Sequence, residues 1–249
     1  MKISIITVAF NAAETLADTL QSVGSQTHAE IEHIVIDGAS TDGTVDIIQR
    51  YAGHITRFIS EPDGGIYDAM NKGLELATGE VIGFLNADDV YTGDHVLQRI
   101  AELMAQNDVD AALGDAEFVN PAHPTRSVRR YRSAHFRPER IGWGWMPAHP
   151  ALFLRRRVYE RFGNFRTDYR IAGDFEWVAR IFHGKTLKYR HIPEVWVRMR
   201  TGGVSTKGWR NTVLLNREVL RACRENNIPT NFPKILLKYP IKLFEFFRR

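Results

Sequence analysis

The hydrophobic positions of the first 115 residues fall into two alternating kinds of segment. Segments predicted to form strands occur at residues 3–9, 34–37, 56–60, 81–85 and 111–115, and the first of them is apolar on both faces, as expected of a buried parallel strand. Segments with apolar residues at helical spacing lie between them, at residues 11–26, 44–51, 66–77 and 96–107. This alternation predicts an α/β fold in which helices cover both faces of a mostly parallel sheet.

The pattern becomes less regular after residue 115. Short strands are predicted at residues 151–154, 187–192 and 195–200, and helices at residues 175–182 and 209–226. No internal repeat or linker-like segment separates the two halves. We therefore predict one compact unit over residues 1–228, followed by a tail at residues 229–249.

Polar side chains follow directly after the predicted parallel strands. In sheets of this kind, ligands bind at the carboxyl ends of the strands. The residues at these positions are Asn11, Asp37, Glu61, Asp63, Asn86, Asp88 and Asp89. Acidic and amide groups are therefore predicted to converge at one edge of the sheet.

The acidic segment at residues 86–89 predicts a metal site. Buried carboxylates are costly unless they are paired, hydrogen-bonded or bound to a cation. Mg²⁺ and Mn²⁺ take oxygen ligands and often share them with substrate phosphates. Asp88 is the predicted ligand, with Asp89 helping directly or through water. The alternative is a helix N-terminus, where Asp is also favoured.

Two further segments carry candidate binding groups. The loop at residues 37–44 contains glycines that permit a tight turn, and its Asp37 can accept hydrogen bonds from a base or ribose. The segment at residues 61–73 places Asp68 and Asn71 three residues apart, on one helix face. An ordinary strand–turn–helix loop and a solvated helix face are the alternative interpretations.

Charge and composition narrow the class of protein. The chain has 44% hydrophobic and 25% charged residues, with a net charge of +4, so we expect a soluble globular protein without a nucleic-acid partner. Basic residues gather at the C-terminus and in one stretch formed by Arg126, Arg129, Arg130, Arg132, Arg137 and Arg140. Such patches suit phosphate groups or an anionic membrane, and a solvated basic surface is the alternative.

The expected location follows from several local features. The single cysteine, Cys223, allows no disulfide within the chain and fits a reducing cytoplasm. Residues 1–9 resemble a first strand rather than a signal peptide, and no segment has the ~18 apolar residues of a membrane span. The tail at residues 229–249 is basic and amphipathic, which predicts peripheral attachment to the inner face of the plasma membrane. A terminal helix packed on the protein's own core is the alternative.

The order and spacing of these motifs resemble the family 2 glycosyltransferases of the GT-A fold. The motifs are Thr7-Val8-Ala9-Phe10-Asn11, residues 37–44, residues 61–73, Asn86-Ala87-Asp88-Asp89, residues 146–150 and residues 171–176. The subgroup that the chain resembles makes colanic acid and other bacterial surface polysaccharides. The resemblance implies a Rossmann-like sheet with a nucleotide-sugar-binding half at residues 1–115, and an acceptor-binding half at residues 116–228.

The resemblance also implies roles for individual residues. The implied donor-binding set is Thr7, Ala9, Asn11, Asp37, Asp68, Asn71, Asn86, Ala87 and Asp88. Asp37 would bind the base, and Asn86 stands at the first position of the family's Asp-x-Asp motif, where it brings no charge. Asp88 would hold Mn²⁺ or Mg²⁺ on the donor diphosphate. His149 is a candidate second metal ligand, with a structural hydrogen bond as its alternative.

Asp174 is the implied general base of an inverting transfer. It would accept the proton of an acceptor hydroxyl as that oxygen attacks the anomeric carbon. Glu176 is the second candidate base, and a helix cap is the alternative role of Asp174. The acceptor would be a glycan or a lipid-linked sugar. The Gln-x-x-Arg-Trp motif of processive members is absent, which favours a single addition, and residues 198–203 lie where a loop could close on phosphates.

Other activities fit the sequence less well. A sugar-nucleotide nucleotidyltransferase or a dinucleotide-dependent dehydrogenase would carry a glycine-rich loop after the first strand, and residues 7–11 contain no glycine. A non-catalytic scaffold of the same fold would have no need of Asp37, Asp88 and Asp174. UDP, GDP and dTDP donors all remain compatible with the sequence.

Overall fold

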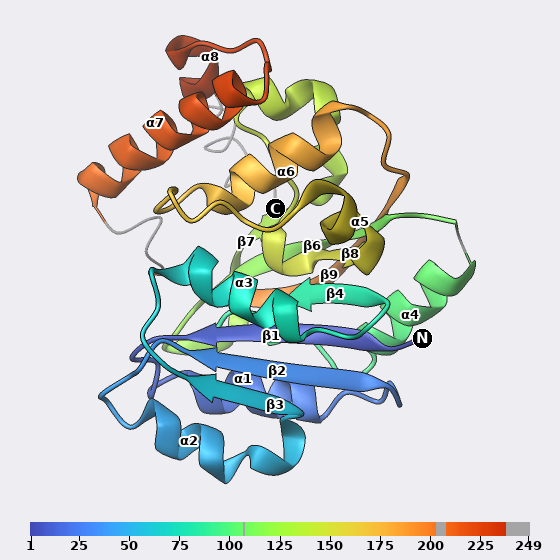
Figure 1. The fold of residues 1–249 in the computed structure, drawn as a ribbon, viewed down its shortest axis with the longest axis vertical. Coiled ribbons are helices and arrows are strands. Elements are labelled where there is room, and N and C mark those ends of the chain that lie inside the picture. Colours follow the sequence, from blue (N-terminus) through green and yellow to red (C-terminus); the bar gives the residue numbers. More distant parts are fainter. Residues whose placement is uncertain (107, 203–207, 238–249) are drawn as a thin grey trace.

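The computed structural model describes residues 1–106, 108–202 and 208–237 (Figure 1). Within these residues, nine strands form one sheet in the order β3-β2-β1-β4-β8-β6-β9-β5, with β7 paired to β6. The strands are β1 (Ile3–Ala9), β2 (Ile31–Asp37), β3 (Arg57–Ser60), β4 (Val81–Phe84), β5 (Asp89–Tyr91), β6 (Ala111–Asn120), β7 (His123–Tyr131), β8 (Leu152–Arg155) and β9 (Tyr189–Arg200). Strands β1 to β4 are mutually parallel, whereas the second half adds antiparallel neighbours through β8, β7 and β5.

Helices cover both faces of the parallel part of the sheet. The α-helices are α1 (Leu16–Gly24), α2 (Thr44–Arg50), α3 (Ile66–Leu76), α4 (Val96–Gln106), α5 (Arg156–Phe162), α6 (Gly173–His183), α7 (Trp209–Glu225) and α8 (Phe232–Leu236). Short 3₁₀ turns are η1 (Ala52–His54), η2 (Ser133–His135), η3 (Pro138–Trp143) and η4 (His149–Ala151). None of the helices in the described part of the chain is long and apolar enough to cross a membrane.

Alternate side chains of β2 point to opposite faces of the sheet, and this explains why helices cover both faces. Ile34 and Ile36 belong to the core cluster that contains Met70 of α3, whereas Val35 packs in a separate cluster with Leu20 of α1. Successive side chains of a strand point to opposite faces, so a strand that is apolar at every position must be covered on both. Figure 1 accordingly shows α3 on one side of the sheet and α1 and α2 on the other.

Strand register brings the polar strand ends together. Ala9 pairs with Asp37, and Asp37 pairs with Ser60, in parallel ladders. Strands β1, β2 and β3 therefore end level with one another at a single edge of the sheet. Strand β4 enters the same ladder through the pair Ile6 and Phe84, so the segment after β4 emerges at that edge too.

The strands and helices predicted for the first half are present, but the short strand β5, which begins at Asp89 in the acidic segment, was not predicted, and one helix starts late. The helix predicted from residue 11 begins only at Leu16. Asn11 has a φ of 48°, and its backbone N–H donates to the Ser40 hydroxyl in the loop after β2. A left-handed residue cannot start an α-helix, so residues 11–15 form a loop at the strand-end edge.

The second half differs more from the prediction. Strand β7 was not predicted, and it contains part of the arginine stretch: Arg130 forms an ion pair with buried Asp115 at 2.7 Å, and the Arg129 guanidinium lies over the Phe118 ring. The two strands predicted at residues 187–192 and 195–200 are one strand, β9, because β6 pairs along both parts and a register shift between Leu113 and Asp115 absorbs the interruption.

The start of the tail packs on the protein. Helix α8 spans only five residues, Phe232–Leu236, and its Ile235 is fully buried in the main core cluster. Its side chains Phe232 and Leu236 are exposed. The remainder of the predicted amphipathic tail, residues 238–249, lies outside the described residues.

Candidate active site

The turn after β4 contains the acidic segment predicted to bind a metal. The Asn86 carbonyl accepts the Asp89 N–H at 3.0 Å, and the Thr19 hydroxyl of α1 donates to the Asp89 carbonyl at 2.8 Å. The Asn86 amide donates weakly to the Asp89 carboxylate at 3.3 Å. Among the described residues, the Asn86 side-chain oxygen is one of few buried polar atoms with no hydrogen-bond partner. Both ends of the turn are therefore fixed while one oxygen stays available for a ligand.

The two carboxyls of this turn are held in an environment that disfavours their charge. Burial, and next the neighbouring charge of Asp88, raise the pKa of Asp89 well above its usual range. Burial also raises the pKa of Asp88, and the charge of Arg200 opposes this shift. A nearby cation would offset both effects. The residues thus fit a divalent ion that is bound partly by the protein and partly by substrate phosphates, as is common for Mg²⁺.

The protein alone supplies too few ligands for a closed metal site. Across the described ranges, no group of three or more His, Cys, Asp or Glu side chains is placed to hold a metal ion. Asp88 instead lines an open cavity of about 370 Å³, together with Glu14, Thr15, Pro121, Arg200, Thr201 and Gly202. Arg200 at the end of β9 also forms an ion pair with Asp18 of α1. The cavity therefore combines an acidic and a basic group, as an ion bound to a diphosphate requires.

The loops after β1 and β2 are bonded to one another. Asp37 is fully buried, and its carboxylate accepts the Ser40 N–H at 3.0 Å, the Ser40 hydroxyl and the Ser60 hydroxyl at 2.7 Å. The Asn11 side-chain oxygen accepts the Thr41 N–H at 3.0 Å. Asp37 and Asn11 therefore shape the loop at this edge. Their predicted contacts with a base stay predictions.

Phe10 is a candidate binding residue that the sequence analysis passed over. It follows β1 directly, and 66% of its surface is exposed. A Cβ added at Gly38 would lie 3.3 Å from the Phe10 ring and 2.5 Å from the Asp63 carboxylate, so these groups meet at the strand-end edge. The position of Phe10 directly after the first predicted strand, at the edge where ligands bind in such sheets, was visible in residues 3–10.

Three predicted donor-binding side chains lie in the interior. Thr7 is fully buried, and its hydroxyl is 3.0 Å from the His33 imidazole, whose pKa burial lowers to about 4. Ala9 is also buried and packs in the α1–α2 cluster. Ala87 is buried in the same cluster. These residues support the strand-end edge from beneath, and their direct contact with a donor stays a prediction.

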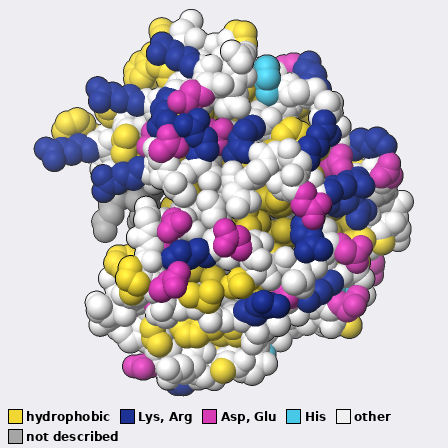
Figure 2. Space-filling view, in the orientation of Figure 1, with side chains coloured by type: hydrophobic (Ala, Val, Ile, Leu, Met, Phe, Trp, Pro, Cys, Tyr) yellow, Lys and Arg dark blue, Asp and Glu magenta, His cyan; other side chains and the backbone are white. Residues whose placement is uncertain are grey.

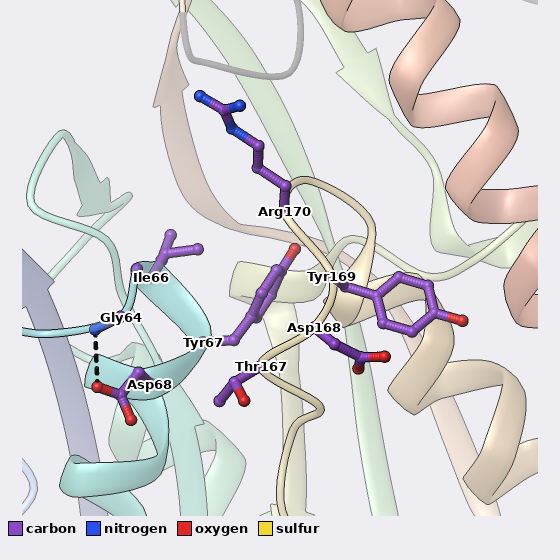
Figure 3. A pocket seen from close by; sticks show the side chains of 9 residues that line it. Gly64, Ile66, Tyr67, Asp68, Thr167, Asp168, Tyr169 and Arg170 are labelled. Atoms are coloured by element: carbon purple, nitrogen blue, oxygen red, sulfur yellow. Dashed lines mark hydrogen bonds between the residues drawn. The ribbon is translucent and has the colours of Figure 1, made fainter.

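Helix α3 carries Asp68 and Asn71, which have separate roles. Asp68 accepts the Gly64 N–H at 2.9 Å, as Figure 3 shows. The Asn71 amide donates to the Phe165 carbonyl and its oxygen accepts the Phe165 N–H, both at 2.9 Å. Asn71 therefore ties α3 to the second half of the chain. Asp68 lines a cavity of about 300 Å³ between residues 64–68 and 167–170 (Figure 3).

Asp174 lies in the first turn of α6, beside Tyr67 and His149. The Tyr67 hydroxyl donates to the Ile171 carbonyl at 2.7 Å and lies 3.4 Å from the Asp174 carboxylate. Burial raises the pKa of Asp174, while the charge of His149 opposes the shift. The carboxylate also accepts the Phe175 N–H at 2.8 Å within its own helix. The N-cap residue of α6 is Ala172, so the alternative role of Asp174 as a helix cap is wrong.

His149 belongs to the Asp174 group. Its ring stacks on Phe84, the last residue of β4, with a centroid distance of 5.5 Å. Burial lowers the pKa of His149, and the charge of Asp174 opposes this. A buried, neutral imidazole next to a carboxylate suits either a hydrogen bond or a metal ligand. Its predicted role as a metal ligand stays a prediction.

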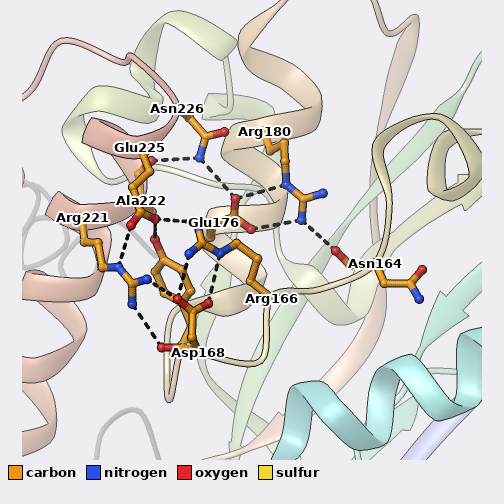
Figure 4. A network of polar contacts seen from close by, with 10 residues as sticks. Asn164, Arg166, Asp168, Glu176, Arg180, Arg221, Ala222, Glu225 and Asn226 are labelled. Carbon is orange, nitrogen blue, oxygen red and sulfur yellow. Dashed lines mark hydrogen bonds and ion pairs between the residues drawn. The ribbon is translucent and has the colours of Figure 1, made fainter.

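Glu176, the second candidate base, is committed elsewhere. It is buried and forms an ion pair with Arg180 at 3.1 Å, and Asn226 donates to the same carboxylate at 3.3 Å (Figure 4). Of the two acidic residues in the first turn of α6, Asp174 is therefore the one whose carboxylate lies beside Tyr67, which lines the 300 Å³ cavity.

The sequence places this constellation in a known family. Residues 4–167 match the family model described as Glycosyl transferase family 2. The chain belongs to glycosyl transferase family 2. It is 32% identical over 195 residues to the PGL/p-HBAD biosynthesis glycosyltransferase of Mycobacterium bovis, covering 76% of this chain and 73% of that protein. An uncharacterized glycosyltransferase of Mycobacterium tuberculosis is 33% identical over 180 residues, which cover 72% of this chain and 68% of that protein.

Solved structures show that this family 2 glycosyltransferase has the GT-A fold. S. aureus TarS 1-349 in complex with UDP-GlcNAc matches with a TM-score of 0.70 at 19% identity, over 89% of this chain and 66% of that one. The mannosyltransferase PcManGT from Pyrobaculum calidifontis, in complex with GDP-Man and Mn²⁺, matches with a TM-score of 0.63 at 21% identity, over 88% of this chain and 64% of that one. In another crystal structure of S. aureus TarS, the matched part of this chain spans 39% of that chain.

Proposed function

We propose that this glycosyltransferase is metal-dependent and inverting, and moves a sugar from a nucleoside diphosphate to a hydroxyl of a glycan or lipid-linked acceptor. The observation that carries the proposal is the Asp88–Asp89 pair in the turn after β4. Burial raises the pKa of both carboxyls, and the buried Asn86 side-chain oxygen next to them has no hydrogen-bond partner. An ion on the donor diphosphate would satisfy all three groups.

The nucleotide would bind across the ends of β1 and β2. The exposed Phe10 ring offers a stacking surface for the base, and the loop shaped by Asp37 offers backbone groups for hydrogen bonds. The similar structures contain UDP-GlcNAc and GDP-Man, which supports UDP- and GDP-sugars as first candidates, with dTDP-sugars also compatible. The diphosphate would then lie toward Asp88 and Arg200 in the 370 Å³ cavity.

Asp174 would act as the general base. Its carboxylate would take the proton of the acceptor hydroxyl while that oxygen forms a bond to the anomeric carbon. The bond from this carbon to the diphosphate oxygen breaks, and a single displacement inverts the anomeric centre. When bound at Asp88, Mn²⁺ or Mg²⁺ supplies positive charge opposite the departing diphosphate. The cavity along residues 64–68 and 167–170, near the Tyr67 hydroxyl, would receive the acceptor (Figure 3).

The pathway would be the synthesis of a bacterial surface polysaccharide or glycolipid at the inner face of the plasma membrane. One relative is named for PGL/p-HBAD biosynthesis, which supports a glycolipid or related acceptor. Exposed apolar side chains on α7 and α8, among them Trp209 and Phe232, lie on helices that also carry Arg210 and Lys234. Figure 2 shows Lys and Arg beside hydrophobic side chains along the upper left of the molecule, where Figure 1 places these helices.

Release of nucleoside diphosphate tests the proposal. UDP-, GDP- and dTDP-sugars would be incubated with the protein and a membrane extract as acceptor source, with Mn²⁺ or with EDTA. We expect release by the wild type, and a loss of ~100-fold or more with EDTA or in Asp88→Ala, because the diphosphate then loses its counter-charge. Asp94→Ala, which changes an exposed carboxylate six residues further along the chain, is the control. Activity that persists in both conditions would refute the metal site, and no release from any donor by folded protein would favour a scaffold.

A further inference from the structure

A buried carboxylate from α7 holds the segment that leads into α6. Glu218 is 8% exposed and accepts three backbone N–H groups, those of Arg170, Ile171 and Ala172, each at 2.8 Å. Three charge-assisted hydrogen bonds to one carboxylate are strong and geometrically restrictive. The segment ends at Ala172, the residue directly before α6, and Asp174 is the second residue of that helix. Glu218 therefore fixes the backbone from which Asp174 projects.

The same peptide group is held from its other side by Tyr67. The N–H of Ala172 donates to Glu218, and the carbonyl of that peptide unit, on Ile171, accepts the Tyr67 hydroxyl at 2.7 Å. A peptide group is planar, so its N–H and C=O point in fixed opposite directions. Glu218 on α7 and Tyr67 on α3 thus grip one rigid unit at both ends, and each hydrogen bond polarises the other.

The Tyr67 hydroxyl also reaches the base. It lies 3.4 Å from the Asp174 carboxylate, and burial raises the pKa of Tyr67, so the hydroxyl stays protonated and its one hydrogen is shared between the Ile171 carbonyl and the carboxylate. Its ring packs directly on the backbone before Asp174, since a Cβ added at Gly173 would lie 2.7 Å from the ring. The ring therefore has no space to move toward α6 if the peptide shifts.

We propose that Glu218 is a positioning residue of the transfer reaction, which sets the Asp174 carboxylate through the peptide between Ile171 and Ala172 and the Tyr67 hydroxyl. This inference rests on the proposed role of Asp174 as the base. Glu218 itself reaches its three backbone partners and none of the residues placed at the donor cavity.

A second group of contacts between α7 and the same loop provides a matched control. Glu225 accepts from Arg166 at 2.8 Å and from the Tyr169 hydroxyl, and Arg221 forms an ion pair with Asp168 (Figure 4). These groups lie at the surface, and they hold residues 166–169 rather than the peptide before α6. Glu225→Gln would thus weaken the attachment of α7 to the loop without releasing the peptide next to Asp174.

The test compares Glu218→Gln, Tyr67→Phe and their double variant by steady-state kinetics over a range of pH, with thermal unfolding of each variant as the folding check. In Glu218→Gln one oxygen becomes an N–H₂ that faces a backbone donor, and the remaining oxygen accepts without a charge, so the hold on the peptide weakens. We expect kcat to fall ~10-fold with little change in the donor KM, and the acidic limb of the kcat profile to move to higher pH, because Asp174 loses the Tyr67 hydrogen bond that lowers its pKa. Tyr67→Phe should give the same shift, the double variant no further loss, and Glu225→Gln neither effect.

The outcomes separate this inference from the proposed function. If Asp174→Asn transfers as fast as wild type, the base assignment fails and this inference fails with it. If Asp174→Asn is inactive while Glu218→Gln keeps the wild-type kcat and acidic limb, only the positioning role is wrong. Additive losses in the double variant would also overturn it. If Glu218→Gln does not fold, Tyr67→Phe, which removes one oxygen only, provides the test. An acidic limb of the kcat profile that stays at the wild-type pH in Tyr67→Phe would then overturn the inference.

Discussion

Single side chains in this protein are tuned by where the sheet and helices bury them. Asp88 and Asp174 both carry carboxyls whose pKa burial raises, yet their neighbours differ. Asp88 lies beside another acid and an unpartnered amide oxygen, which favours a bound cation. Asp174 lies beside a phenol hydroxyl and an imidazole, and a carboxyl with a raised pKa is a better proton acceptor near neutral pH.

Replacing Asp174 by Asn separates the base role from the contact with the first turn of α6. The Asn side-chain oxygen can still accept the Phe175 N–H, so we expect Asp174→Asn to keep most of the thermal stability of the wild type while kcat falls by ~10² to 10⁴. Asp46→Asn changes an exposed first-turn Asp of α2 and serves as control. In the wild type, activity should fall as pH drops through the raised pKa of Asp174, because the base becomes protonated. A near-normal kcat in Asp174→Asn would refute the base role and leave Asp174 only its contact with the first turn of α6.

At the scale of elements, one buried carboxylate joins three segments at the opposite end of the strands from the site. Glu32 of β2 accepts from Lys2 at 2.9 Å, from the Ser4 hydroxyl of β1 at 2.6 Å, and from the N–H and hydroxyl of Thr78 at 2.7 Å each. Burial alone would raise the pKa of Glu32, but these hydrogen bonds outweigh it and lower the pKa to about 2. The contact thus fixes how α3 returns to β4.

This carboxylate predicts an acid-sensitive part of the stability. Because the pKa of Glu32 is lower in the folded state than the ordinary 4.5, its contribution is complete above pH 4.5 and is lost as pH falls toward 2. The contribution is on the order of 3 kcal/mol. Urea unfolding at pH 7 and pH 3 should show a smaller pH-dependent loss for Glu32→Gln than for the wild type. Equal losses in the two proteins would show that Glu32 does not carry this linkage.

At the scale of the whole molecule, one sheet joins the half that contains Asp88 to the half that contains Asp174. Strands β8 and β6 continue the sheet from β4, and α3 packs against both halves through Asn71 and Tyr67. The Asp88 turn and the Asp174 group are therefore linked by β4 itself, whose last residue, Phe84, stacks on His149. The exposed apolar and basic side chains of α7 and α8 lie on the second half.

Deleting residues 238–249 tests the proposed membrane attachment. This segment is basic and aromatic in sequence, and it follows α8 directly. We expect the full chain to sediment with anionic vesicles at low salt and less at high salt, and the deletion to lose most of this binding. Neutral vesicles are the control, and release of diphosphate with a soluble acceptor should be unchanged. Equal binding of both proteins to anionic vesicles would refute an anchoring role for this segment.

The elements that the sequence predicted well are those whose buried positions form a regular hydrophobic pattern within the element itself. Strand β1 has the predicted bounds, and α3 ends one residue before the predicted position. Strand β7 escaped prediction because its arginine-rich sequence has no apolar alternation, and it is held by pairing with β6 and by contacts such as Arg130 with Asp115. The helix predicted from Asn11 starts late because of a bond to a loop 29 residues away.

The sequence by itself determined the parallel sheet and the edge where polar groups follow strands, since these depend on spacing within a few residues. Only the tertiary structure decided which groups meet. It put Thr7 in the interior, used Asn71 as a tie to Phe165, and brought Tyr67 to Asp174 across 107 residues of sequence. Such contacts depend on how helices pack over the sheet, and no periodic pattern within one segment encodes the identity of a partner in another.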